Sequence, residues 1–181
     1  MPTIVFASPK GGVGKSTAAV LLATELAGFG ASVSLIDADP NKPLSQWAKR
    51  PGKPANLTVL SDVTEESIID TIESAASKTP FVIVDLEGTA SMMVGYAMSR
   101  ADLVIIPVQA SHLDATEAAK AIKLVRAQER VFKRTIPYTV LFTRTSTAIR
   151  TRSLQSIYQQ FVPESQRKVV ERLSTLSRLI N

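Results

Sequence analysis

One short segment limits the possible folds of this chain more than any other: Pro9-Lys10-Gly11-Gly12-Val13-Gly14-Lys15-Ser16-Thr17. It follows an apolar run and opens an amphipathic one. Glycines let the backbone curl so that consecutive N–H groups face one centre, and a helix N-terminus adds its positive end. The spacing therefore predicts a phosphate-binding loop in which Lys15 reaches the terminal phosphates and the Ser16 hydroxyl binds Mg²⁺. An ordinary strand-to-helix turn does not require Gly-Lys-Ser at this spacing.

The rest of the chain alternates apolar and amphipathic runs, which predicts alternating strands and helices. Strands buried on both faces of a parallel sheet are expected at Thr3–Ser8, Ser32–Asp37, Leu57–Leu60, Phe81–Leu86, Leu103–Val108 and Pro137–Thr143. Helices are expected at Ser16–Gly28, Leu44–Arg50, Thr64–Lys78, Met92–Ser99, Asp114–Phe132 and Thr151–Phe161. Asp114 and Glu117 have the spacing of a capping box for the fifth helix. The pattern predicts a doubly wound α/β fold with a mainly parallel sheet, as a single domain over residues 1–181.

The composition excludes several classes of protein. The 181 residues include no cysteine and one histidine, so disulfides, thiolate metal sites and iron–sulfur clusters are excluded and a zinc site has almost no ligands. No apolar run approaches the roughly 20 residues that span a bilayer, and the N-terminus has no signal-peptide pattern. A cytoplasmic protein is expected.

Charge is distributed unevenly along the chain. Residues 1–119 carry a net charge of −5, whereas residues 120–152 hold nine basic residues and one acid. Such a basic block is typical of a surface that binds nucleic acid or another polyanion, although a solvated helix face has the same composition. The candidate DNA contacts are Lys120, Lys123, Arg126, Arg150 and Arg152.

Four segments resemble, in order, the motifs of the ParA/MinD family of ATPases. Residues 10–17 resemble its deviant Walker A box, with an additional lysine at Lys10. Val33–Pro40 resembles the second acidic box, Phe81–Asp85 the Walker B strand, and Ala101–Val108 the strand that follows. The resemblance covers residues 3–145 and is greatest to small plasmid-type ParA partition proteins. It implies a P-loop NTPase fold.

The resemblance also implies roles for individual residues. ATP and Mg²⁺ would bind at residues 10–17, and Lys10 would reach across a two-fold dimer to the partner's ATP. Asp39 would position the attacking water, while Asp37, Asp85 and Ser16 would hold the magnesium, the two aspartates through its waters. The catalytic set is then Lys10, Lys15 and Asp39. The nucleotide contacts are Lys10, Gly11, Gly12, Val13, Gly14, Lys15, Ser16 and Thr17, with Thr143 and Arg144 in the adenine pocket.

Two segments depart from the family pattern. Leu86-Glu87-Gly88-Thr89 stands where the family often has Thr-Pro or Thr-Ala-Gly. Glu87 would contact water, metal or the other subunit, or simply face solvent. Residues from about 163 to 181 do not resemble the family's C-terminal strand and adenine-flanking loop.

The function implied is that of a nucleotide switch. ATP promotes a homodimer that binds DNA nonspecifically at the nucleoid, and a ParB-like centromere-binding protein stimulates hydrolysis, which drives plasmid or chromosome segregation. One alternative is a MinD-like membrane-surface ATPase, because Arg167–Ile180 is amphipathic and basic, although it has no Trp or Phe. The other is a small P-loop phosphotransferase or ligase, which would leave Lys10 and the basic block unexplained.

Overall fold

A computed structural model describes residues 1–88, 91–109 and 112–143, with the side chains of residues 112–115 left out of the description. Within this part of the chain, six strands form one sheet in the order β3-β2-β4-β1-β5-β6. Each strand of this sheet is parallel to its neighbours. The strands are β1 (Thr3–Phe6), β2 (Val33–Ala38), β3 (Leu57–Leu60), β4 (Phe81–Leu86), β5 (Leu103–Gln109) and β6 (Tyr138–Thr143). The predicted parallel α/β fold is confirmed.

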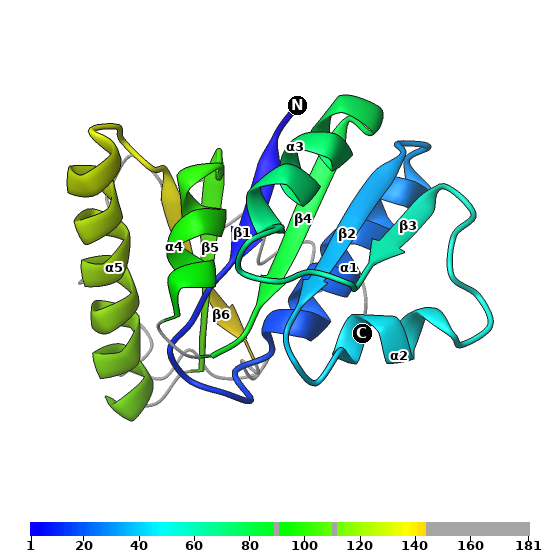
Figure 1. Cartoon of the computed structure of the whole chain (residues 1–181). Coiled ribbons are helices and arrows are strands. Elements are labelled where there is room, and N and C mark those ends of the chain that lie inside the picture. The colour runs from blue at the N-terminus through cyan, green and yellow to red at the C-terminus, as the bar shows by residue number, and fades with distance from the viewer. Residues whose placement is uncertain (89–90, 110–111, 144–181) are drawn as a thin grey trace.

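Helices cover both faces of the sheet (Figure 1). Their bounds are α1 (Lys15–Gly28), α2 (Pro43–Ala48), α3 (Ile68–Lys78), α4 (Met92–Ser99) and α5 (His112–Phe132). The small side chains of α1 and Leu44 of α2 pack with Phe6, Leu35 and Ile83 on one face. The buried residues of α3, α4 and α5 form the larger core on the other face. The sheet is therefore the middle of three layers.

Two predicted helix starts differ from those of the structure. The helix expected from Thr64 begins at Ile68, after a turn in which the Thr64 and Ser67 side chains accept hydrogen bonds from each other's backbone N–H (3.3 and 2.9 Å). This reciprocal pair is the arrangement of a capping box, and the backbone N–H of Ile68 donates to the carbonyl oxygen of Thr64 at 3.0 Å. The expected capping box at Asp114 fails because α5 already begins at His112, and an N-cap must precede its helix. Glu117 is paired with Lys120 instead (2.7 Å).

The carboxyl ends of β1, β2 and β4 lie at one edge of the sheet, where ligands of open α/β sheets bind. Neighbouring strands bring two acids together there, because Asp37 of β2 is in register with Asp85 of β4. At the opposite edge, the carboxylate of Asp102 accepts the backbone N–H of Thr3 at 2.7 Å. No helix in the described ranges is long and apolar enough to cross a membrane.

Candidate functional site

The predicted phosphate loop connects β1 to α1. Gly12 (φ 72°) and Gly14 (φ 93°) have left-handed backbone, which side chains other than glycine rarely adopt. Gly14 occupies the N-cap position of α1 without a side-chain cap of its own. The N–H groups of the first helical turn are thus available to an anion, and the helix dipole favours negative charge there.

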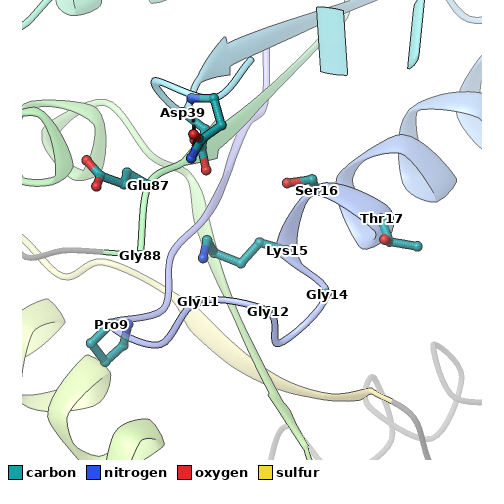
Figure 2. A pocket seen from close by; sticks show the side chains of 11 residues that line it. Pro9, Gly11, Gly12, Gly14, Lys15, Ser16, Thr17, Asp39, Glu87 and Gly88 are labelled. Carbon is teal, nitrogen blue, oxygen red and sulfur yellow. Dashed lines mark hydrogen bonds between the residues drawn. The ribbon is translucent and has the colours of Figure 1, made fainter. Parts of the chain in front are cut away.

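A cavity of about 500 Å³ opens above this loop (Figure 2). Its walls come from the phosphate loop and from the segments that follow β2 and β4. They consist of Pro9, Gly11, Gly12, Gly14, Lys15, Ser16, Thr17, Asp39, Asn41, Glu87 and Gly88. Three of the four segments predicted from the sequence, far apart along the chain, therefore meet at one site.

Lys15 supplies the buried positive charge of the cavity. Only 7% of the residue is exposed, and its ammonium lies 3.4 Å from the carbonyl oxygen of Lys10. Burial lowers the pKa of Lys15, and the nearby carboxylates of Asp85 and Asp39 oppose that shift. A bound phosphate would place a negative charge beside this ammonium and so stabilise its charged form, which burial alone disfavours.

Asp37 and Asp85 form a buried acidic pair beneath the cavity, with exposures of 1% and 0%. One oxygen of Asp37 accepts the N–H and hydroxyl of Ser45, both at 2.9 Å, and so caps α2. Among the described residues, the other oxygen of Asp37 has no donor, and neither oxygen of Asp85 has one in ordinary hydrogen-bond geometry, although the Ser16 hydroxyl lies close enough to favour the Asp85 carboxylate. Burial raises the pKa of Asp85 to about 7, against the opposing effects of Ser16 and Lys15.

These oxygens fit a magnesium site. Buried carboxylate oxygens need a cation or a donor, and Mg²⁺ is bound by oxygen atoms, several of which belong to water. In the part of the chain described, no group of three or more His, Cys, Asp or Glu side chains is arranged to hold a metal. The hydroxyl of Ser16 and the carboxylates of Asp37 and Asp85 supply oxygen atoms of the kind that Mg²⁺ binds, and their role as magnesium ligands stays a prediction.

Asp39 and Glu87 are half-buried acids in the wall of the cavity. One oxygen of Asp39 accepts the backbone N–H (2.8 Å) and the side-chain amide (3.0 Å) of Asn41, which holds its carboxylate in a turn. Glu87 directly follows β4 and lies in the wall of the cavity (Figure 2). The structure thus makes Glu87 a cavity residue, while its contact with water, metal or the other subunit stays a prediction.

The sequence matches the VirC1 protein family over residues 1–174. The chain belongs to this family. It is also 49% identical over 157 residues to Protein ParA of Rhizobium radiobacter, covering 87% of this chain and 71% of that protein. VirC1 of the same species is 28% identical, with 69% of this chain and 56% of that protein covered, so the match spans little more than half of VirC1. The predicted membership of the ParA/MinD partition ATPases is confirmed.

Solved structures share the fold of this VirC1-family chain at low sequence identity. Cyanothece McdA has a TM-score of 0.75 at 18% identity, covering 99% of this chain and 93% of McdA. A plasmid partition protein from Borrelia burgdorferi bound to AMPPNP has a TM-score of 0.68 at 20% identity, with coverages of 88% and 81%. These likenesses confirm the predicted P-loop α/β fold.

The two lysines of the phosphate loop of this family member differ in placement. Lys15 lines the cavity, whereas the described residues that form its walls do not include the half-buried Lys10. The role of Lys10 in a partner's site stays a prediction. The last predicted nucleotide contact, Arg144, lies outside the described residues.

Two side chains hold the phosphate loop from the ends of β5 and β6. The Thr143 hydroxyl lies 2.7 Å from the carbonyl oxygen of Val13, so this residue contacts the loop, and its adenine contact stays a prediction. The Gln109 amide donates to the carbonyl oxygen of Gly12 at 3.0 Å. Gln109 was missed because its only signal was its position at the end of an expected strand.

The basic block divides into exposed and structural residues. Lys123 and Arg126 are exposed on α5, while the exposed Lys120 forms an ion pair with Glu117. Arg134 turns inward, and its guanidinium donates to the carbonyl oxygens of Met98 and Ala101 at the end of α4. The block is therefore not a single solvent-facing surface. Arg150 and Arg152 lie outside the residues described.

Proposed function

We propose that this VirC1-family chain is an ATP-dependent partition ATPase that acts on DNA. It binds ATP with Mg²⁺, associates as a homodimer when ATP is bound, and holds DNA nonspecifically at the nucleoid. A ParB-like protein stimulates hydrolysis, which releases the dimer and drives plasmid or chromosome segregation. The observation that carries this proposal is the cavity, whose walls contain a glycine-rich loop and the buried Lys15, at the edge of the sheet where the buried Asp37 and Asp85 are paired.

Nucleotide binding rests on complementary charge. The N–H groups of the phosphate loop and the ammonium of Lys15 face a polyanion, as the phosphates of ATP are. Ser16, Asp37 and Asp85 hold the magnesium, which supplies positive charge against the phosphates. The AMPPNP bound to the Borrelia partition protein of the same fold supports this assignment.

Hydrolysis and dimerisation rest on two further residues. Asp39 lies in the cavity wall with one oxygen held by Asn41, which suits a group that orients water. Lys10 acts on the nucleotide of the second subunit, much as an arginine finger supplies charge in trans. Lys15, which lines the cavity, acts on the nucleotide of its own chain.

DNA binding rests on the exposed basic residues Lys123 and Arg126 of α5, with Lys120, Arg150 and Arg152 extending the surface. Exposed cations bind phosphates without reading the base sequence, as nonspecific binding requires. The 49% identity to a protein named ParA, and the fold shared with a plasmid partition protein, support DNA as the polyanion.

The test is a DNA-pelleting assay with ATP, ADP or no nucleotide, run beside vesicles of anionic phospholipid. Binding to arbitrary DNA only with ATP is the expected result. Binding only to the vesicles would instead support a MinD-like function. Binding to neither would contradict the proposal that ATP controls binding to DNA. Lys10→Ala is the informative variant, because it should still bind ATP but form no dimer with a nonhydrolysable analogue in light-scattering measurements.

A further inference from the structure

Two consecutive carbonyl groups of the phosphate loop are held by side chains from other strands. The Gly12 carbonyl accepts from Gln109 at the end of β5, 97 residues away in sequence, at 3.0 Å. The Val13 carbonyl accepts from the Thr143 hydroxyl at the end of β6, 130 residues away, at 2.7 Å. The partner atoms are carbonyl oxygens, so both side chains act as hydrogen-bond donors.

Peptide geometry connects these two bonds to the ligand side of the loop. The peptide group is planar and trans, so its C=O and N–H point in opposite directions. The Gly12 carbonyl shares a peptide with the N–H of Val13, and the Val13 carbonyl shares one with the N–H of Gly14. Holding both carbonyls toward β5 and β6 directs these two N–H groups the other way, toward the cavity that Gly12 and Gly14 line.

We infer that Gln109 and Thr143 are positioning residues that fix two N–H donors of the loop for phosphate. The inference rests on the proposed nucleotide-binding function and adds residues that contact neither phosphate nor metal. A glycine-rich loop needs such support, because glycine gains more backbone freedom than any other residue when it is released. Gln109 is the last residue of β5, so its bond joins the loop to the end of that strand.

Packing reinforces the contact at Thr143. A Cβ added at Gly14 would lie 3.6 Å from the Thr143 methyl carbon, so the threonine lies directly against the loop. Its hydroxyl is also 3.2 Å from the carbonyl oxygen of Val108. Its single proton is donated to the closer oxygen, that of Val13, so removing the hydroxyl alone removes this bond to the loop while the side chain still packs against Gly14.

The test compares Gln109→Leu and Thr143→Val, which keep much of the side-chain volume but lose the donor, with Thr143→Ser, which keeps the hydroxyl. Thr58→Val, on the exposed surface of β3, is the matched control. Calorimetry gives the affinities for ADP and for inorganic pyrophosphate, both with magnesium, and the ratio of ATP to GTP affinity. Melting temperatures identify any variant that has lost its fold.

Both donor-deleting variants should bind ADP and pyrophosphate about threefold to tenfold more weakly, as expected for one lost hydrogen bond, with the ATP-to-GTP ratio unchanged. Thr143→Ser and Thr58→Val should stay within about twofold of the unmodified protein by the same reasoning. Folded variants with unchanged ADP affinity would overturn the inference. A Thr143→Val variant that changes only the ratio of ATP to GTP affinity would also overturn it, because that result would mean that Thr143 contacts the nucleotide base and does not position the loop. If the unmodified protein binds neither ADP nor pyrophosphate, the proposed function itself fails.

Discussion

The cavity and the outer surface of α5 both gather charged side chains, but they do so in opposite surroundings. Lys15 in the cavity wall is 7% exposed, and the nearby Asp85 is fully buried. On α5, Lys123 and Arg126 are exposed, while Glu117 pairs with Lys120 and Glu129 accepts the backbone N–H of Ile136. The same kinds of ion are therefore desolvated in one region and hydrated in the other.

This difference determines how much each charge can contribute. The attraction between two charges is several times stronger near low-dielectric protein than in water. At an ionic strength of about 0.1 M, salt largely screens the interaction between exposed charges that are more than about 10 Å apart. Exposed ion pairs contribute little to stability, whereas removing one member of a buried set leaves the others uncompensated. We therefore expect large, discrete effects in the cavity and small, additive effects on α5.

Lys15→Ala should produce the largest effect. It removes the buried ammonium that faces the phosphates, and ATP affinity should fall at least about 100-fold, the scale of a broken buried ion pair. Calorimetry measures the loss, and Lys49→Ala, an exposed lysine just after α2, is the control. Normal ATP affinity in Lys15→Ala would remove the basis for the phosphate site.

Asp39→Ala should separate binding from turnover. ATP affinity should stay within a few fold, while phosphate release should fall by about 100-fold or more because the group that orients water is absent. Light scattering should show a persistent ATP-bound dimer. Undiminished turnover would transfer this role to another acid of the cavity, and Glu87→Gln would then be the variant to measure.

Asp85→Asn should increase the stability of the nucleotide-free protein. The folded pKa of about 7 lies above the ordinary value of 3.8, so this carboxyl's contribution to stability is present below pH 4 and is lost as the pH rises through 7. The gain in melting temperature should therefore be larger at pH 8 than at pH 5, and about 3 °C or more at pH 8. A gain in melting temperature that is the same at pH 5 and pH 8 would contradict the free-energy cost assigned to burying the Asp85 carboxylate.

The double variant Lys123→Ala/Arg126→Ala should have the smallest effect. Each lost phosphate contact should weaken binding to all DNA sequences alike and reduce the slope of log affinity against log salt by about 1. Lys120→Ala should have less effect, because its ammonium is already paired with Glu117. A loss confined to one DNA sequence would contradict binding through phosphates. Unchanged DNA binding at matched salt would mean that Lys123 and Arg126 only face solvent and do not contact DNA.

The comparison also separates what the sequence could predict from what it could not. Strands β3 and β4 and helix α4 have the predicted bounds, because continuous apolar runs and their polar borders are local signals. The phosphate loop with Lys15 and Ser16 was found for the same reason. The strand order was not predicted, and neither were the bonds of Gln109 and Thr143 to the loop. Those contacts join residues 97 and 130 positions apart, and only the folded sheet brings them together.

Asp37 gives the molecule an internal optical probe. One of its oxygens caps α2 through Ser45, while the other belongs to the proposed magnesium site. Helix α2 carries Trp47, the only tryptophan of the chain, packed half-buried at the edge of the core. A movement of the Asp37 side chain on ligand binding would therefore shift α2 and with it the surroundings of Trp47. We expect the fluorescence emission of Trp47 to report occupancy of the site without an added label.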